Sequence, residues 1–191
     1  RRLLSFSIID QVGFMVCAAG IGTPLAIGGA CAHAFCHIIY KGLLFMSAGA
    51  VIDRTGKSKF SDLGGLYQTM PLTLIFGLIG AFAISGVPFF SGFTSKSIIL
   101  HAVEMKHLFV PWLILEIASM GVFLHAGIMF PYFIFFGKNS GLRPKEAAKP
   151  MLLGMAILAG LCVYIGCFPE KLYSMLPYAD AVFANTKSTF Y

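Results

Sequence analysis

The chain has 191 residues, of which 58% are hydrophobic and only 12% are charged, with a mean hydropathy of +0.83. A soluble domain of this length carries about twice that share of charge, so the composition excludes a water-soluble protein and indicates an integral membrane protein. The net charge of +6 does not indicate a nucleic-acid partner, because the basic residues fall in short loops between apolar segments.

Five apolar segments follow one another along the chain, at residues 3–21, 31–52, 71–106, 109–136 and 151–168. A helix that crosses a bilayer needs roughly 20 apolar residues, so four of the segments fit one crossing each. The third segment is too long for one straight helix and short for two. We predict an all-α, polytopic membrane protein with about five transmembrane helices, divided into a transmembrane domain (1–168) and a C-terminal tail (169–191).

The first segment carries one carboxylate, Asp10, near one of its ends, where an interhelical contact is the simplest interpretation.

The second segment carries a polar ladder in an otherwise apolar run. His33, His37 and Lys41 are spaced four residues apart, which places them on one helix face over about 12 Å. Imidazole both donates and accepts hydrogen bonds, and burial disfavours the charged form of an amine. The ladder therefore indicates a proton relay.

Lys41 lies near the centre of this run, where a charge costs roughly 2.5–3.5 kcal/mol on insertion scales. Two other interpretations of the histidines stay open. Histidines one turn apart can bind zinc, although the sequence offers no third ligand nearby and the Lys41 cation opposes a metal. The histidines can also be structural and bonded to neighbouring helices.

The third segment contains a predicted break at 85–92. Pro88 lacks a backbone donor and clashes with the preceding turn, while Gly86 and Gly92 permit non-helical dihedral angles. Unwound backbone at membrane depth occurs where protein or a water-filled cavity covers it, and broken helices mark ion sites in transporters. Lys96 follows the break by about one turn. We therefore predict a functional helix break rather than an ordinary proline kink.

The fourth segment places Glu116 in its first third and His125 near its middle. We expect both either on the proton path or in satisfied contacts between helices. Glu116 is also a candidate counter-ion for a lysine, and the sequence does not specify which one.

No phosphate loop, nucleophile elbow, CxxC pair or flavin motif is found, so we expect no cofactor, no metal and no redox chemistry in this chain. The cysteines are interpreted as small packing residues.

The basic residues of the loops indicate how the third segment crosses. If every segment crosses once, nine of the 14 basic residues lie on one side and three on the other. The larger group is Arg1, Arg2, Arg54, Lys57, Lys59, Lys138, Arg143, Lys145 and Lys149, and the smaller group is Lys106, Lys171 and Lys187. If the third segment crossed twice, the last four basic residues of the larger group would change sides and the asymmetry would nearly vanish, so we predict a single crossing. Positive residues favour the cytoplasmic side. We expect a multi-pass protein of the cell (inner) membrane, with a cytoplasmic N-terminus and the C-terminus on the opposite side.

Four stretches carry a resemblance to a known family. HAFCHIIYKGLLFMSAGAVI (33–52) resembles the histidine and lysine helix of antiporter-like membrane subunits, namely the D-type members of Mrp sodium/proton antiporters and the large proton-pumping subunits of respiratory complex I. GVPFFSGFTSKSIIL (86–100) is similar to the broken helix of that family. RRLLSFSIIDQVGFM (1–15) resembles the opening of the family helix that comes before the histidine and lysine helix. FLHAGIMFPYFIFFG (123–137) resembles the next-to-last helix of the D-type members.

The resemblance implies roles for individual residues. Lys41 would be the central channel lysine, His33 and His37 the relay histidines, and Lys96 the lysine that ends the half-channel on the broken helix. The family has about fourteen helices in two inverted repeats, and this chain resembles the last five, which belong to the second half of that fold. The chain begins with Arg1, so a fragment and one piece of a split subunit both stay open.

We therefore expect a proton-translocating, antiporter-like subunit of a multisubunit membrane complex, most simply a D-type member of a cation/proton antiporter. Its expected partners are other membrane subunits of an Mrp-type or complex I-like assembly, the lipid bilayer and protons, with sodium left open. Two alternatives remain. One is a proton-pumping subunit of an NADH-quinone oxidoreductase-like complex, and the other is a truncated structural scaffold subunit without transport.

Overall fold

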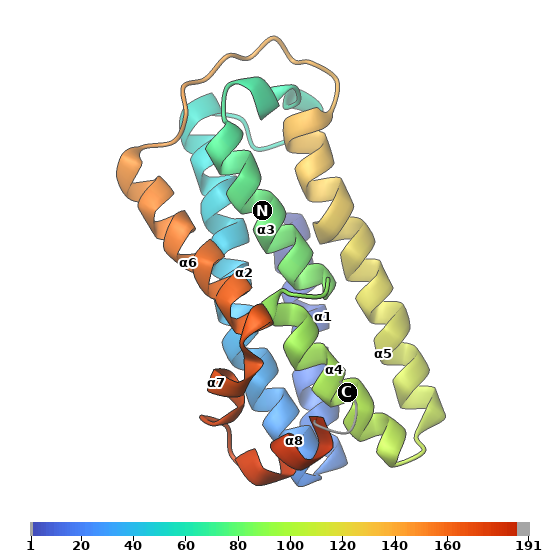
Figure 1. Cartoon of the computed structure of the whole chain (residues 1–191). Coiled ribbons are helices and arrows are strands. Elements are labelled where there is room, and N and C mark those ends of the chain that lie inside the picture. The colour runs from blue at the N-terminus through green and yellow to red at the C-terminus, as the bar shows by residue number, and fades with distance from the viewer. Residues whose placement is uncertain (1, 187–191) are drawn as a thin grey trace.

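The computed structural model describes residues 2–186, which form a bundle of helices joined by short loops (Figure 1). The α-helices are α1 (Arg2–Ile21), α2 (Pro24–Thr55), α3 (Pro71–Ser85), α4 (Ser91–Met105), α5 (Phe109–Val122), α6 (Lys149–Cys167), α7 (Pro169–Tyr173) and α8 (Ala179–Thr186). Two 3-10 turns, η1 (Phe60–Asp62) and η2 (Leu66–Gln68), follow α2, and two π-helical stretches, η3 (Phe123–Met129) and η4 (Tyr132–Phe136), follow α5. Arg1 and Lys187, both used in the loop-charge argument, lie outside the described residues.

Four helices are long and apolar enough to cross a membrane. They are α1, α2, α6 and the continuous helix Phe109–Phe136, which comprises α5, η3 and η4. The pair α3 and α4 runs end to end through the bundle and supplies a fifth, interrupted crossing (Figure 1). The prediction of an all-α membrane protein with about five crossings and one broken helix is confirmed.

Helix α2 forms the centre of the bundle and packs against α1, α3, α4 and α6. It begins at Pro24, because the Thr23 hydroxyl accepts the Ala26 N–H at 3.2 Å and proline is favoured in a first helical turn. The predicted segment began seven residues later, at residue 31. The structure shows that Gly28 and Gly29 belong to the helix, where they allow close approach of α8 and α4. A side chain at Gly28 would lie 2.8 Å from the Val182 side chain.

The break between α3 and α4 falls within the predicted stretch. Gly86 has a φ of 75° and ends α3, and Phe89 has a φ of 70° although it is not a glycine. Gly92, in the first turn of α4, packs directly against the Ala83 carbonyl of α3, where any β-carbon would collide with it. The two half-helices therefore meet through backbone, and Pro88 lies in the turn that separates them.

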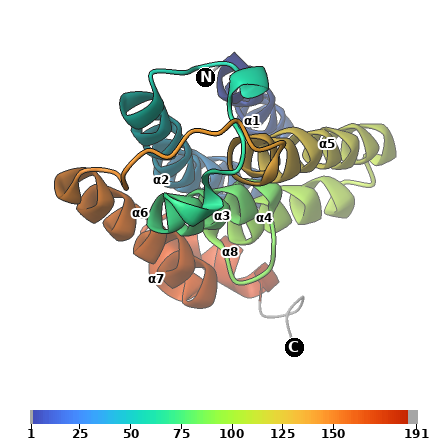
Figure 2. The same ribbon diagram turned by 90° about the horizontal axis from the view of Figure 1, so that it is seen from above.

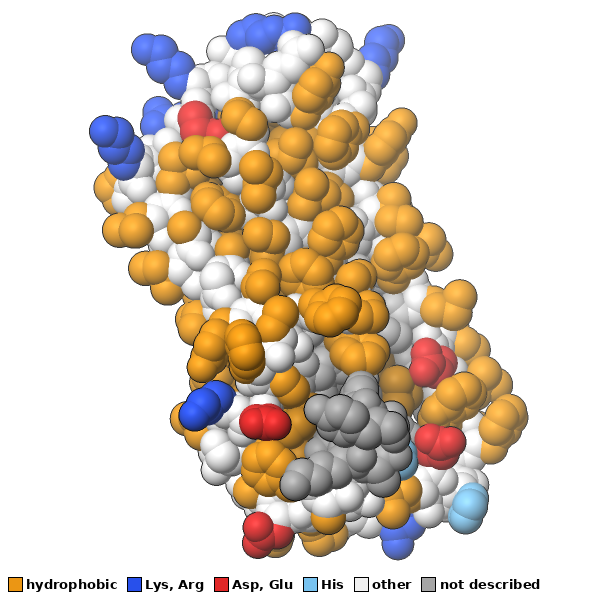
Figure 3. Space-filling model, viewed as in Figure 1, with side chains coloured by type: hydrophobic (Ala, Val, Ile, Leu, Met, Phe, Trp, Pro, Cys, Tyr) orange, Lys and Arg blue, Asp and Glu red, His pale blue; other side chains and the backbone are white. Residues whose placement is uncertain are grey.

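The loops at 56–70 and 137–148 lie at the same end of the bundle (Figure 1). Lys and Arg side chains gather at that end of the face seen in Figure 3, while apolar side chains cover the middle. Glu146 ties the loop at 137–148 to the start of α3, since its carboxylate accepts the Leu72 N–H at 2.8 Å and the Thr73 hydroxyl at 2.6 Å.

Large apolar side chains point away from the bundle on the outer helices. Ile9 of α1, Ile117 of α5 and Leu153 of α6 are 60–70% exposed. Figure 2, which looks down the bundle, places α5 and α6 on opposite sides of it. Such an apolar outer surface suits contact with lipid or with further membrane helices.

The π-helical stretches were not predicted. Pro131 separates η3 from η4 and has no N–H to donate, so the regular hydrogen-bond register cannot continue through it. Gly127 of η3 approaches Ser85 at the end of α3 closely enough that a side chain at Gly127 would collide with the Ser85 hydroxyl. The wider turn therefore occurs where the helix packs against the break.

Candidate proton pathway

Both intramembrane lysines are buried. Lys41 of α2 is 5% exposed, and its amine donates a hydrogen bond to the Ser7 hydroxyl of α1. Lys96 of α4 is 4% exposed. Both side chains are almost completely covered by the bundle, so neither is a snorkelling lysine of the membrane interface.

The Lys96 amine is held by two hydrogen bonds from different helices. It donates to the Ile84 carbonyl of α3 at 2.9 Å and to the Ser119 hydroxyl of α5 at 3.1 Å. It also lies 5.4 Å from the centre of the Phe14 ring of α1, within the range of a cation–π contact. Lys96 therefore joins the two halves of the broken helix to the helices on either side.

The two histidines of α2 extend the polar row towards α4. His33 is fully buried and its Nδ1 lies 2.9 Å from the Ser95 hydroxyl. The His33 and His37 rings are stacked with their centres 6.4 Å apart. The Nε2 atoms of both rings are buried without a hydrogen-bond partner among the described residues, which is rare for buried polar atoms.

These contacts give the order of the polar groups. Lys41 lies at one end of the row, His37 and His33 follow, and Ser95 connects His33 to α4 next to Lys96. The row contacts α4 from its His33 end, through Ser95, and not from its Lys41 end. The reason is the crossing of the helices, which the periodicity of one helix cannot specify.

A second set of hydrogen bonds anchors α1 to α2. The Tyr40 hydroxyl donates to Gln11 Oε1 at 2.8 Å, and Gln11 Nε2 donates to the Asp10 carboxylate at 2.7 Å. Asp10 interacts electrostatically with both Lys41 and Lys96. Asp10 therefore ends a chain of hydrogen bonds that runs from α2 to α1.

Glu116 and His125 take different positions. Glu116 is half-buried on α5, three residues before Ser119, and interacts electrostatically with Lys96. Glu116 thus lies about one helical turn from Ser119, which contacts the Lys96 amine. His125 lies in η3, exposed and apart from the histidines of α2, with its Nδ1 donating to the Gly121 carbonyl at 2.8 Å. His33, His37, Lys41 and Lys96 thus form the row, with Glu116 beside it.

The residues that sequence reasoning missed are the hydroxyls of Ser7, Ser95 and Ser119. Each lies on a different helix and touches one of the titratable side chains. The available signal was weak, because serine is common in membrane helices and bonds its own backbone as readily as a neighbouring helix. Together the groups make a buried row of donors and acceptors suited to passing protons.

Comparisons with known proteins show which proteins this chain is similar to. The family model for the NADH:quinone oxidoreductase/Mrp antiporter transmembrane region matches residues 1–129. The D subunit of the Na⁺/H⁺ antiporter of Alkalihalophilus pseudofirmus is 33% identical over 97% of this chain, and the L subunit of the NADH-quinone oxidoreductase of Campylobacter jejuni is 31% identical over 92%. The chain spans 38% and 29% of the lengths of these two relatives.

A solved structure is also similar. In the membrane-bound sulfane sulfur reductase, an archaeal respiratory membrane complex, one chain superposes with a TM-score of 0.82 and 38% sequence identity. The match covers 87% of this chain and 28% of that one.

Proposed function

The chain belongs to the transmembrane family of the NADH:quinone oxidoreductases and Mrp antiporters, and from that premise we propose that it translocates protons as part of a multisubunit membrane complex. The proton would move along the buried row Lys41, His37, His33 and Lys96, with Glu116 as counter-ion of Lys96. His125 would take part from outside that row.

The observation that carries this proposal is the burial of two amines beside two imidazoles with unpartnered nitrogens. Titratable groups at membrane depth are costly and are retained chiefly where charge or protons move. Each imidazole can accept a proton on one nitrogen and release one from the other. Charges on Lys41 and Lys96 also interact with each other, so a proton gained at one lysine favours loss of a proton at the other.

Orientation and partners follow from the same premise. The described basic loops lie at one end of the bundle, and positive loops favour the cytoplasm. We propose a cytoplasmic N-terminus and the C-terminus on the opposite side. We propose further membrane subunits as partners, because the relatives are by name subunits of larger assemblies and the chain spans well under half of their length.

A redox-driven complex is a second candidate. The 38% identity with a chain of the sulfane sulfur reductase complex makes it a candidate beside the antiporter. The same buried row would then move protons while a partner performs the redox reaction. Sodium-driven proton flux in vesicles supports the antiporter, and proton uptake that starts only with an electron donor and acceptor supports the redox complex.

The test is proton uptake by the assembled complex after Lys41→Ala or Lys96→Ala. Each substitution is expected to lower the rate about tenfold or more, because it removes a group that must carry the proton. Lys106→Ala is the matched control, since Lys106 lies just after α4 and is exposed. Co-purification of partner subunits verifies assembly. Uptake at the wild-type rate by either lysine variant would overturn the proposed pathway, and by both would leave a scaffold role.

A further inference from the structure

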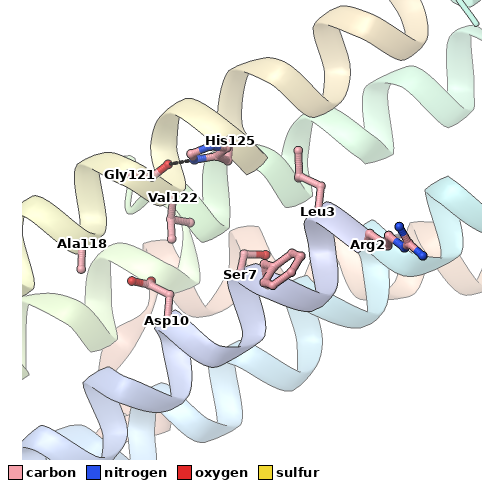
Figure 4. A pocket seen from close by; sticks show the side chains of 9 residues that line it. Arg2, Leu3, Ser7, Asp10, Ala118, Gly121, Val122 and His125 are labelled. Carbon is pink, nitrogen blue, oxygen red and sulfur yellow. Dashed lines mark hydrogen bonds between the residues drawn. The ribbon is translucent and has the colours of Figure 1, made fainter. Parts of the chain in front are cut away.

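A cavity of about 520 Å³ lies between α1 and the helix formed by α5 and η3. Its lining is mostly apolar, but four polar side chains reach it, namely those of Arg2, Ser7, Asp10 and His125. Figure 4 shows Ser7 and Asp10 on α1 and His125 on the opposite helix, around the space between the two helices. A cavity of this size is large enough for several water molecules, and the polar side chains on its walls provide hydrogen-bond partners for them.

The cavity is connected directly to the buried row. Ser7 lines it, and the Ser7 hydroxyl is also the group that accepts the hydrogen bond from the Lys41 amine. Lys41 is therefore one hydrogen bond away from the cavity, although its own side chain is almost fully buried. The same hydroxyl donates to the Leu4 carbonyl at 3.0 Å, which fixes its position on α1.

Asp10 lies three residues after Ser7 and therefore on the same face of α1. It is half-buried and forms no ion pair with any residue in 2–186. Its charge nevertheless acts on both Lys41 and Lys96. A carboxylate without an ion-pair partner at membrane depth is unfavourable unless water reaches it or function requires it.

His125 adds a second proton acceptor across the cavity. Because a carbonyl oxygen only accepts hydrogen bonds, the Nδ1 atom that contacts Gly121 carries the proton in the neutral ring. The Nε2 atom is then left with a lone pair. The cavity thus has a carboxylate on one wall and an imidazole on the other.

We propose that this cavity is the entrance through which water-borne protons reach Lys41, with Asp10 as the group that collects them. A proton from water adds to the Asp10 carboxylate and makes the neutral acid. The acid then gives a proton through water to the Ser7 oxygen, while Ser7 passes its own hydroxyl proton to the neutral Lys41 amine. Asp10 returns to the carboxylate, Ser7 is unchanged and Lys41 becomes an ammonium ion. The proposal of this entrance rests on the proposed function, because it identifies where protons enter the proposed pathway.

The position of Arg2 indicates the side from which protons enter. Asp10 is eight residues further along α1 than Arg2, or about 12 Å. Helix α1 starts towards the end of the bundle where the basic loops lie (Figure 1). The entrance would therefore open to the proposed cytoplasmic side.

The first experiment measures water access without measuring transport. Ala118→Cys places a thiol in the cavity, and Ile117→Cys places one on the outward-facing neighbour, which is 60% exposed. Both are made in the whole complex with Cys17, Cys31 and Cys167 replaced by serine, while the buried Cys36 and Cys162 stay. A charged methanethiosulfonate should modify Ala118→Cys about tenfold or more faster, because thiolate forms only in contact with water. Equal and slow modification would mean that lipid or another helix fills the cavity, and would overturn the proposal.

The second experiment separates proton collection by Asp10 from a purely structural role. Asp10→Ala should lower proton uptake about tenfold or more, Asp10→Glu should retain it, and acetate, which fits in the cavity, should restore part of it. Gln11→Met leaves the Asp10 carboxylate in place but removes the hydrogen bond that Gln11 donates to it, and this variant should retain proton uptake. If Gln11→Met loses as much as Asp10→Ala and acetate restores neither, Asp10 only positions Gln11, and the proposal is wrong.

The two proposals fail separately. The Lys41→Ala variant, assayed at the same acetate concentration, is the control for protons that acetate itself carries across the membrane. An inactive Lys41→Ala together with an unreactive Ala118→Cys would retain the proton pathway and reject this entrance. Normal uptake by Lys41→Ala would reject the pathway, whatever the reactivity of the cavity.

Discussion

The amine of Lys96 takes the place of a backbone donor that Pro88 lacks. In a continuous helix the Ile84 carbonyl would accept the N–H of residue 88, but proline has none. The Lys96 amine donates to that carbonyl instead, at 2.9 Å. The proline and the lysine therefore act as one unit, because the break creates the acceptor and the lysine satisfies it.

This pairing predicts a non-additive pair of substitutions. Lys96→Met keeps the apolar stem but leaves the Ile84 carbonyl without its partner, which should destabilise the chain by about 1–3 kcal/mol. Adding Pro88→Ala restores an N–H that would bond to the Ile84 carbonyl if α3 extends by one turn, so the double variant should recover part of that loss. Thermal unfolding of the solubilised complex measures both changes, with Lys106→Met as the exposed control. Strictly additive effects would show that Pro88 and Lys96 act independently.

At the scale of elements, α6 holds the break in its bent form. Gly166 of α6 packs against the backbone of Phe89 and Phe90, where any β-carbon would overlap main-chain atoms. The Cys167 thiol also lies 3.9 Å from the Phe89 carbonyl. Phe89 has a left-handed φ of 70°, a conformation that costs energy for a residue with a side chain. Packing against α6 is therefore part of what maintains the turn.

Gly166→Ala should displace the break and slow proton uptake, while Gly160→Ala should leave both unchanged. Gly160 lies on the same helix, and no atom lies within 4 Å of the position that a β-carbon would take there. Alanine at Gly160 therefore gains only helix propensity, up to about 1 kcal/mol. Hydrogen exchange of residues 85–92 measures the displacement directly. Unchanged exchange and uptake in Gly166→Ala would mean that α6 does not control the break.

Prediction from sequence succeeded for features that one element contains and missed those that two elements share. The spacing of His33, His37 and Lys41 and the break around Pro88 are local patterns, and the structure shows a buried ladder and a bent turn there. The start of α2 was placed too late. Glycine is a weak helix former, and the reason for Gly28 in this helix, which is the close packing of α8 against it, is a tertiary contact. The π-helical register of η3 likewise depends on packing against α3.

At the scale of the whole molecule, the arrangement of loops fixes the two faces of the protein. Single crossing by the α3–α4 pair puts the loop at 56–70 and the loop at 137–148 at one end and α7 at the other (Figure 1). Charged impermeant reagents should therefore label Lys57→Cys from the cytoplasmic side only and Lys171→Cys from the opposite side only. The test uses right-side-out and inverted vesicles, with the exposed native cysteines replaced by serine. Labelling of both positions from the same side would contradict the single crossing.

The hydroxyl groups that contact the titratable side chains, and the order of the groups along the proposed proton path, are also properties of the whole molecule. Ser7, Ser95 and Ser119 come from α1, α4 and α5, and only the assembled bundle brings each to its titratable partner. Asp10 had no clear role in the sequence, and its place beside a cavity that touches Ser7 appears only when α1 and α5 are packed together. Crossing angles and neighbours of helices are tertiary properties that hydrophobic periodicity does not encode.

The most direct test of the central claim is the charge state of the two buried amines during turnover. Solid-state nitrogen NMR of the complex with labelled lysine amines would assign the two signals by their loss in Lys41→Met and Lys96→Met. The account predicts that at least one of them changes between ammonium and neutral amine when proton transport is driven, and that the exposed Lys106 does not. Two amines that keep one fixed charge state throughout transport would contradict the account.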